Sequence, residues 1–125
     1  MSEDLPCRMP AVVLLVEDDV LLRLVTASSL RDMGFEVFEA ASAAEAVIVL
    51  NTMAVDALLS DVNIPGQMDG FGLAKWVRDR RLGTRIILSS EKPQSLGDAE
   101  EYACFLAKPY DDEEVQQLLI RMLSH

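Results

Sequence analysis

Cysteine is scarce in this chain, and acidic residues outnumber basic ones. Only Cys7 and Cys104 occur, which is too few for a disulfide framework and favours a reducing cytoplasm. The formal net charge is −10, from 21 acidic and 11 basic residues, so we expect no binding to nucleic acid, which requires clustered lysine and arginine. Uninterrupted apolar runs are far shorter than a membrane span, so a membrane is not expected as a partner either.

Hydrophobic residues, by contrast, are abundant and regularly placed. They make up 50% of the 125 residues, which suits one compact domain with a real core. A more polar run at residues 35–39 predicts a strand at the edge of a sheet. Apolar runs predict four buried strands, at residues 12–16, 55–60, 85–89 and 104–107.

Helical patterns lie between these runs. The first covers residues 20–33, with Val25 and Leu30 among its inward positions, and stops at Gly34. The second and the last begin at capping boxes, the third covers residues 71–81, and residues 93–102 leave only a short or irregular helix. The predicted capping boxes are Ser42 with Glu45 and Asp111 with Glu114. Strands and helices alternate five times, which predicts a doubly wound parallel sheet covered on both faces.

Polar side chains stand at the ends of four predicted strands. Asp18 and Asp19 follow the first strand, and Asp61 follows the third. Ser89 ends the fourth strand and Lys108 follows the fifth. The carboxyl ends of parallel strands lie along one edge of the sheet, where α/β proteins bind ligands. We therefore expect one site that suits a divalent metal and a phosphoryl group.

The carboxylates at this edge predict a cation. Two carboxylates ~4 Å apart repel by ~4 kcal/mol at an effective dielectric constant near 20, so the group needs raised pKa values or a positive ion. Hard oxygen ligands with open coordination positions suit Mg²⁺, and Asn63 could add a backbone carbonyl. The ammonium of Lys108 can balance the acids and then a phosphoryl oxygen. Taken singly, each residue is also explained as a helix cap, a turn residue or a surface lysine.

The spacing of these signals resembles the receiver domain of bacterial two-component response regulators, the CheY-like proteins. The residues that carry the resemblance are Glu17-Asp18-Asp19, Asp61 with Pro65 and Met68-Asp69-Gly70, Ser89 and Lys108-Pro109-Tyr110. The resemblance covers residues 11–124 and implies a flavodoxin-like sheet with strand order 2-1-3-4-5. We expect a receiver domain at residues 11–125 behind a tail at residues 1–10. Because the predicted domain ends near the last residue, a stand-alone receiver that acts by docking is expected.

The resemblance also implies a phosphorelay function. A histidine kinase or a histidine phosphotransfer protein would donate the phosphoryl group, and the domain would catalyse only its own phosphorylation and dephosphorylation. The surface around residues 93–110 would then change shape for an unknown downstream protein target. The implied roles are Asp61 as phosphoacceptor; Asp18, Asp19, Asp61 and the backbone carbonyl of Asn63 as Mg²⁺ ligands; Ser89 and Lys108 as phosphoryl contacts; Ser89 and Phe105 as the switch; and Asn63 and Glu91 as the positions that tune dephosphorylation.

Three positions depart from the commonest receiver pattern. The loop at residues 65–70 is one residue longer, so its path past the acidic site differs. Phe105 replaces a frequent tyrosine and has no hydroxyl to anchor a buried or an exposed rotamer. Ser89 replaces the commoner threonine, which keeps the hydroxyl donor and removes a methyl group.

Other functions remain open at this point. A phosphatase of the haloacid-dehalogenase type also uses an aspartyl phosphate. The pattern typical of such enzymes has a second aspartate two residues after the first, where this chain has Asn63. The chain also has no room for a cap domain. A flavin or nucleotide binder of similar fold would want an anion-binding nest where Asp18 and Asp19 stand. A receiver-like interaction module that is never phosphorylated is disfavoured by the presence of the acids, the hydroxyl and the lysine.

Overall fold

The computed structural model describes residues 10–80, 83–92 and 95–124. Its five strands are all parallel and form one sheet in the order β2-β1-β3-β4-β5. This confirms the predicted fold class and strand order. The strands are β1 (Val12–Val16), β2 (Glu36–Ala40), β3 (Ala57–Asp61), β4 (Arg85–Ser90) and β5 (Ala103–Ala107).

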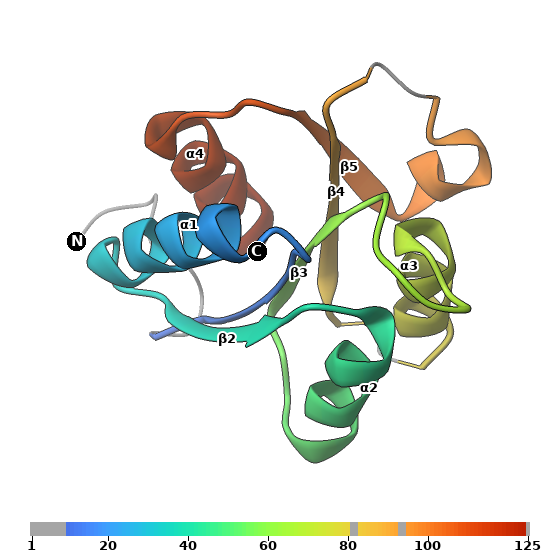
Figure 1. Cartoon of the computed structure of the whole chain (residues 1–125). Coiled ribbons are helices and arrows are strands. Elements are labelled where there is room, and N and C mark those ends of the chain that lie inside the picture. Colours follow the sequence, from blue (N-terminus) through green and yellow to red (C-terminus); the bar gives the residue numbers. More distant parts are fainter. Residues whose placement is uncertain (1–9, 81–82, 93–94, 125) are drawn as a thin grey trace.

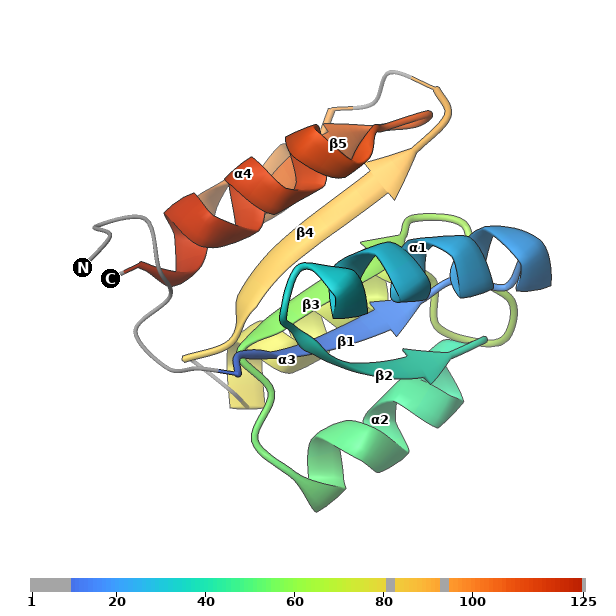
Figure 2. The same cartoon turned by 90° about the vertical axis from the view of Figure 1, so that its left-hand side faces the viewer.

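Helices cover both faces of the sheet (Figures 1 and 2). Helices α1 (Val20–Asp32) and α4 (Asp112–Leu123) pack on one face, and α2 (Ala43–Thr52) and α3 (Gly70–Arg80) pack on the other. In the described part of the connection between β4 and β5, the chain forms one 3₁₀ helix, η1 (Gly97–Glu101). The weak helical pattern of residues 93–102 predicted this short element, although residues 93 and 94 lie outside the described residues. No helix in the described part of the chain is long and apolar enough to cross a membrane.

The core consists of two layers, because successive strand residues point to opposite faces. In β1, Val13 and Leu15 pack toward α1 and α4, whereas Leu14 and Val16 pack toward α2 and α3. All five residues of β1 are buried, as are the first four of β3. The continuous apolar runs of these two strands therefore place them in the middle of the sheet, covered on both sides.

The helix ends make the predicted capping hydrogen bonds, except that one bond at α2 is shifted by one residue. Gly34 has a φ of 102°, and the bond from Phe35 N to Leu30 O closes the end of α1. The Asp111–Glu114 capping box is complete. At α2, Ser42 accepts the Glu45 amide, but the Glu45 carboxylate accepts the amide of Ala41, one residue before the position that a capping box requires.

Two burial predictions were wrong. Val25 is 56% exposed, because the smaller Thr26 and Ala27 occupy the buried face of α1 together with Leu30. Cys104 is also exposed, because β5 is an edge strand rather than an interior one. Cys7, the rest of the tail at residues 1–9, and Arg81 lie outside the described residues.

Candidate functional site

Most of the predicted site residues lie at the carboxyl edge of the sheet. Asp61 is the last residue of β3 and pairs in register with Ser89 of β4. Lys108 directly follows β5, and residues 17–19, here called the acidic turn, connect β1 to α1. The parallel topology thus brings four strand ends to one edge of the sheet, as the sequence predicted.

Three carboxylates form a cluster at this edge. Glu17, Asp18 and Asp61 each offer an oxygen, and these oxygens lie within 4.8 Å of one another. Asp19 lines the same cavity but is outside this cluster, because it is the N-cap of α1 and its carboxylate accepts the Leu22 amide at 3.0 Å. Glu17 therefore replaces Asp19 in the cluster. An aspartate directly before a helical period is a known capping signal, so the sequence contained the means to assign Asp19 to this role.

Lys108 is the positive partner of the cluster. Its ammonium lies 2.5 Å from Glu17 Oε1 and 3.2 Å from Asp61 Oδ2, and its side chain is only 8% exposed. Burial alone would lower the pKa of Lys108. The hydrogen bonds to Glu17 and Asp61 and their negative charges outweigh that effect, so the pKa lies above its ordinary value. The ammonium is thus held charged against two carboxylates.

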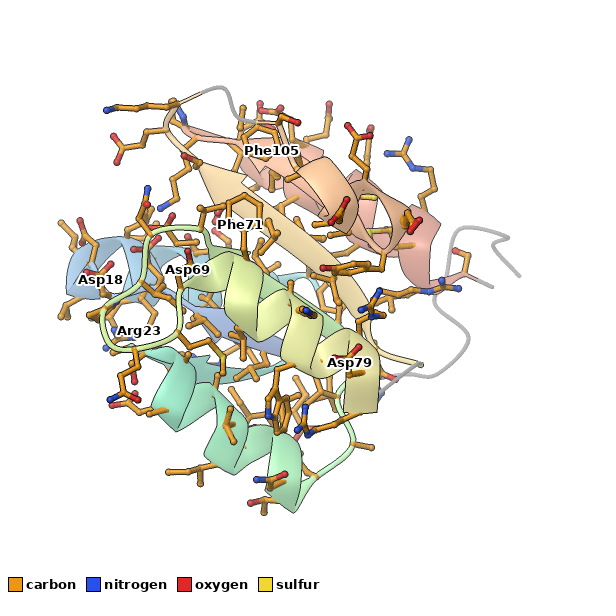
Figure 3. The ribbon with its side chains drawn as sticks, turned by 90° about the vertical axis from the view of Figure 1, so that its right-hand side faces the viewer. Asp18, Arg23, Asp69, Phe71, Asp79 and Phe105 are labelled. Carbon is orange, nitrogen blue, oxygen red and sulfur yellow. The ribbon has the colours of Figure 1, made fainter. Side chains whose placement is uncertain are left out.

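The backbone amide, the backbone carbonyl and the carboxylate of Glu17 each make a hydrogen bond within the protein. Its amide donates to Ala40 O at 3.0 Å, and its carbonyl accepts from Arg23 at 2.8 Å. Its second carboxylate oxygen accepts the Asp19 amide at 3.1 Å. Figure 3 shows Asp18 and Arg23 at the same end of the molecule, at the start of α1. The acidic turn is therefore held by bonds to β2, to α1 and to Lys108.

A cavity of about 460 Å³ opens above the acids. Asn63, Glu91 and Lys108 line it, and the Asn63 amide also donates to Asp61 Oδ1 at 3.2 Å. Ser90 lines this cavity, whereas the predicted Ser89 does not and is 2% exposed. The structure therefore brings most of the predicted residues together but offers a second hydroxyl, Ser90, that the sequence interpretation overlooked.

The loop after β3 returns closely to the Asp61 backbone. Gly70 donates its amide to Val62 O at 2.8 Å. A Cβ atom on Gly70 would lie 2.7 Å from the Val62 Cα and closer still to the Asp61 carbonyl oxygen. The neighbouring Asp69 caps the first turn of α3 through the Gly72 amide at 2.9 Å (Figure 3). Only glycine fits at position 70 without moving the backbone of the predicted phosphoacceptor.

Phe105 lies away from the acids. It is half-buried on β5, in register with Leu88 of β4. Leu88 belongs to the core layer under α3, so Phe105 stands on that face of the sheet, as does Phe71 at the start of α3 (Figure 3). The predicted switch residue is thus next to β4 and partly open to solvent.

Comparisons with known proteins agree with this geometry. The family model of the response regulator receiver domain matches residues 13–120. The chemotaxis response regulator CheY4 of Vibrio cholerae is 33% identical, with a TM-score of 0.80 over 90% of this chain and 98% of that one. The receiver domain of the hybrid histidine kinase CckA is also 33% identical, with a TM-score of 0.78 over 90% of this chain and 99% of that one.

A longer relative shows the same domain in a different setting. The DNA-binding transcriptional regulator NtrC of Klebsiella pneumoniae is 32% identical over 115 residues, which are 89% of this chain and 24% of that protein. This chain therefore spans about a quarter of the length of that relative. Receiver domains are signalling modules rather than enzymes in the ordinary sense. The chain belongs to the response regulator receiver domain family, whose members act in phosphorelay signalling.

Proposed function

We propose that this chain is a phosphorylation switch in which Asp61 accepts the phosphoryl group. One observation carries the proposal: the Asp61 carboxylate ends a central strand, 3.2 Å from a buried ammonium and in a cluster with two other carboxylates. The donor is a phosphohistidine on a kinase or a phosphotransfer protein. An Asp61 oxygen forms the new bond to phosphorus while the P–N bond of the donor breaks and its imidazole leaves.

The residues around Asp61 supply positioning and positive charge, which are what phosphoryl transfer mainly requires. Lys108 binds a phosphoryl oxygen, and Glu17 holds its ammonium in place. A hydroxyl at the end of β4 donates to another oxygen, with Ser89 the predicted donor. Because these groups belong to the receiver itself, we propose that it catalyses its own phosphorylation and dephosphorylation.

Mg²⁺ is the proposed cofactor. The cluster of Glu17, Asp18 and Asp61 fits it, because three carboxylates whose oxygens lie within 4.8 Å repel one another and present hard oxygen ligands. The backbone carbonyl of Asn63 remains a proposed fourth ligand. When bound, the ion neutralises negative charge on the acids and on the incoming phosphoryl group. Asp19 is left out of the proposed set because it caps α1.

A docking surface for the phosphoryl donor lies beside the site. Leu21 and Val25 are 72% and 56% exposed on the first turns of α1, directly after the acidic turn. They line a groove of about 730 Å³ together with Pro109 and Tyr110. Exposed apolar side chains gathered next to a reactive group suit a protein partner. We propose that the kinase or phosphotransfer protein contacts this groove while its histidine reaches Asp61.

The proposed readout runs through β4. A phosphoryl group on Asp61 gives the Ser89 hydroxyl a strong acceptor and draws the start of the β4–β5 connection toward the site. Phe105, half-buried beside Leu88, then turns inward, and full burial of its ring would contribute on the order of 1.5–3 kcal/mol. The surface of β5, η1 and α4 changes with it and selects the downstream target.

Acetyl phosphate with Mg²⁺ tests the acceptor. The wild-type protein should gain one phosphoryl mass that hydroxylamine removes, and Asp61→Asn should gain none. Asp69→Asn is a matched control, since Asp69 lies in the loop after β3 and asparagine also caps helices well. An adduct that survives in Asp61→Asn, or one absent from the wild-type protein, would count against the proposal and favour an interaction module.

The metal ligands are tested by titrating Mg²⁺ and following backbone NMR shifts. Asp18→Asn should weaken binding by at least about tenfold, because it removes a charged oxygen ligand. Asp19→Asn should change the affinity less than about twofold, because asparagine keeps the cap and Asp19 is outside the cluster. Equal losses in both variants would return Asp19 to the ligand set.

The phosphorylated state should be short-lived. Asn63 and Glu91 line the cavity above Asp61, and their polar side chains can orient an attacking water. Glu91→Leu should therefore lengthen the lifetime of the adduct by several-fold, measured as loss of the phosphoryl mass without a phosphatase. A wild-type lifetime of many hours would contradict this role for the two residues.

A further inference from the structure

We infer that Arg23 is a positioning residue that aims Asp18 into the acidic cluster. The inference rests on the proposed function, since it assigns a purpose to a residue outside the metal site. Arg23 is on the first turns of α1, and its side chain is only 17% exposed. Its guanidinium donates to the Glu17 carbonyl at 2.8 Å and to the Glu39 carboxylate of β2 at 3.3 Å.

The bond from Arg23 to the Glu17 carbonyl fixes the orientation of the peptide group that precedes Asp18. A peptide group is planar, so holding the Glu17 carbonyl also holds the amide of Asp18. The peptide on the other side of Asp18 is held as well, because the Asp19 amide donates to the Glu17 carboxylate at 3.1 Å. Asp18 itself is exposed. Its direction therefore depends on these two pinned peptides, and Arg23 holds one of them.

The second bond anchors Arg23 to the sheet. Glu39 binds two arginines, Arg23 at 3.3 Å and Arg31 at 3.2 Å. The two differ in what else they reach. Arg31 is 49% exposed and donates to the Val37 carbonyl within β2, far along the strand from the acids, whereas Arg23 reaches the acidic turn. Glu39 thus binds one arginine that also holds the peptide before Asp18 and one that does not, so the two arginines can be compared.

Groups that orient a ligand without touching the metal often change metal affinity by about 10- to 100-fold when they are removed. Arg23→Ala should therefore raise the dissociation constant for Mg²⁺ by about tenfold. Arg31→Ala, which also removes a Glu39 partner, should leave it within about twofold of wild type. Arg23→Lys keeps the charge but has no rigid fork to join Glu17 and Glu39 at once, so it should give an intermediate value.

A second readout does not need the metal. The amide of Asp18 belongs to the peptide that Arg23 holds, so its ¹⁵N order parameter reports the proposed restraint directly. It should fall from the rigid range of about 0.85 toward about 0.6 in Arg23→Ala, and stay rigid in Arg31→Ala. A merely structural role for Arg23 would lower the unfolding temperature of both variants and leave the Asp18 amide rigid.

These measurements separate the inference from the proposed function. If the wild-type protein binds no Mg²⁺, the proposed metal site fails, and the order parameter still decides the role of Arg23. If the wild type binds Mg²⁺ and Arg23→Ala binds equally well with a rigid Asp18 amide, the inference is overturned. A weaker metal affinity together with a mobile Asp18 amide, both absent in Arg31→Ala, is the expected result.

Discussion

The two ends of the signalling path are built differently. At the acidic turn, Glu17 is bonded through its amide, its carbonyl and both carboxylate oxygens. In the described part of the connection between β4 and β5, the one helix is the five-residue 3₁₀ helix η1, whose N-cap residue Leu96 makes no side-chain cap bond and whose one buried residue is Ala99. The chemistry is thus placed where the backbone is held tightly, and the proposed response where few contacts hold it.

This difference has a physical logic. Phosphoryl transfer depends on reactive groups that are already in position, so each bond around Glu17 reduces the reorganisation that the reaction needs. A conformational response needs two arrangements of similar free energy, which a weakly packed segment supplies more readily. Four substitutions, taken from the largest expected effect to the smallest, would break or sharpen this contrast.

The largest effect is expected at Gly70. Gly70→Ala would press a Cβ atom against the backbone of Asp61 and Val62, and overpacking of this kind costs about 3 kcal/mol of unfolding free energy. Urea denaturation measures the loss, and phosphorylation by acetyl phosphate should slow as well. Gly83→Ala is the control, because no atom lies within 4 Å of the position that its Cβ would take. Equal stability of Gly70→Ala and wild type would show that the backbone at Asp61 is not held tightly.

Lys108→Met should have the next largest effect. It removes charged hydrogen bonds to Glu17 and Asp61 and leaves their carboxylates to repel, a loss of about 2 kcal/mol in metal-free buffer. Mg²⁺ should recover part of this loss in the variant. Lys75→Met, at an exposed position on α3, should be neutral. A destabilised Lys75→Met or an unaffected Lys108→Met would contradict the assignment.

The stability gap between wild type and Lys108→Met should also depend on pH. The pKa of Lys108 is raised in the folded protein, so its contribution is fully present below the unfolded value of about 10.4 and disappears as pH rises through the folded value. The gap should therefore be constant from pH 7 to about pH 10 and shrink above that. Burial also raises the pKa of Tyr110 and the charge of Lys108 opposes that rise, so the comparison is made in a Tyr110→Phe background.

The hydroxyl at the end of β4 links the two regions, and its loss should shift the switch by about 1 kcal/mol, or about fivefold. Ser89→Ala should still be phosphorylated on Asp61 but fail to show the NMR shift changes of Phe105 and residues 95–102. Ser90→Ala should show them in full. The reverse outcome would transfer the role to Ser90, which lines the cavity in this structure.

The smallest effect is expected in the β4–β5 connection itself. The Arg78 guanidinium lies 4.7 Å from the Tyr102 ring centre and ties the end of η1 to α3. Arg78→Ala should weaken this region by about 0.5–1 kcal/mol, seen as faster exchange of the Tyr102 amide, which donates to Ala99. Arg80→Ala removes a similar contact with Trp76 and should leave Tyr102 unchanged. Slower exchange of the Tyr102 amide in Arg78→Ala, or equal changes in both variants, would refute the proposed contact between η1 and α3.

Most of the fold followed from the sequence because its strands and helices have distinct periods. The run of residues 12–16 is buried throughout, and its boundaries agree with β1 in full. Errors arose where burial depends on a neighbour that the chain meets only in three dimensions. Cys104 was expected inside because its run is apolar, but the edge position of β5 leaves it exposed. Val25 was expected inside because the sequence does not show which face of α1 the sheet covers.

The candidate site could be predicted to within about one residue. Strand ends indicated Asp61 and Lys108, and both lie at the cluster. The choice between Glu17 and Asp19 depended on where β1 ends and α1 begins, and element boundaries are the least certain part of a sequence pattern. Arg23 gave no signal at all, because its significance comes from bonds to Glu17 and Glu39 that only the folded chain brings together.

Because Lys108 is buried, the reactivity of the lysines in this chain toward chemical labels can report on the acidic cluster. Amine-directed reagents attack the neutral amine, so a lysine that is 8% exposed and held protonated by two carboxylates should react slowly. Lys75 and Lys92 are exposed and should react at ordinary rates, which gives each measurement an internal standard. The labelling ratio of Lys108 to these two lysines, read by mass spectrometry, would then report the state of the acidic cluster in a mixture as complex as a cell extract.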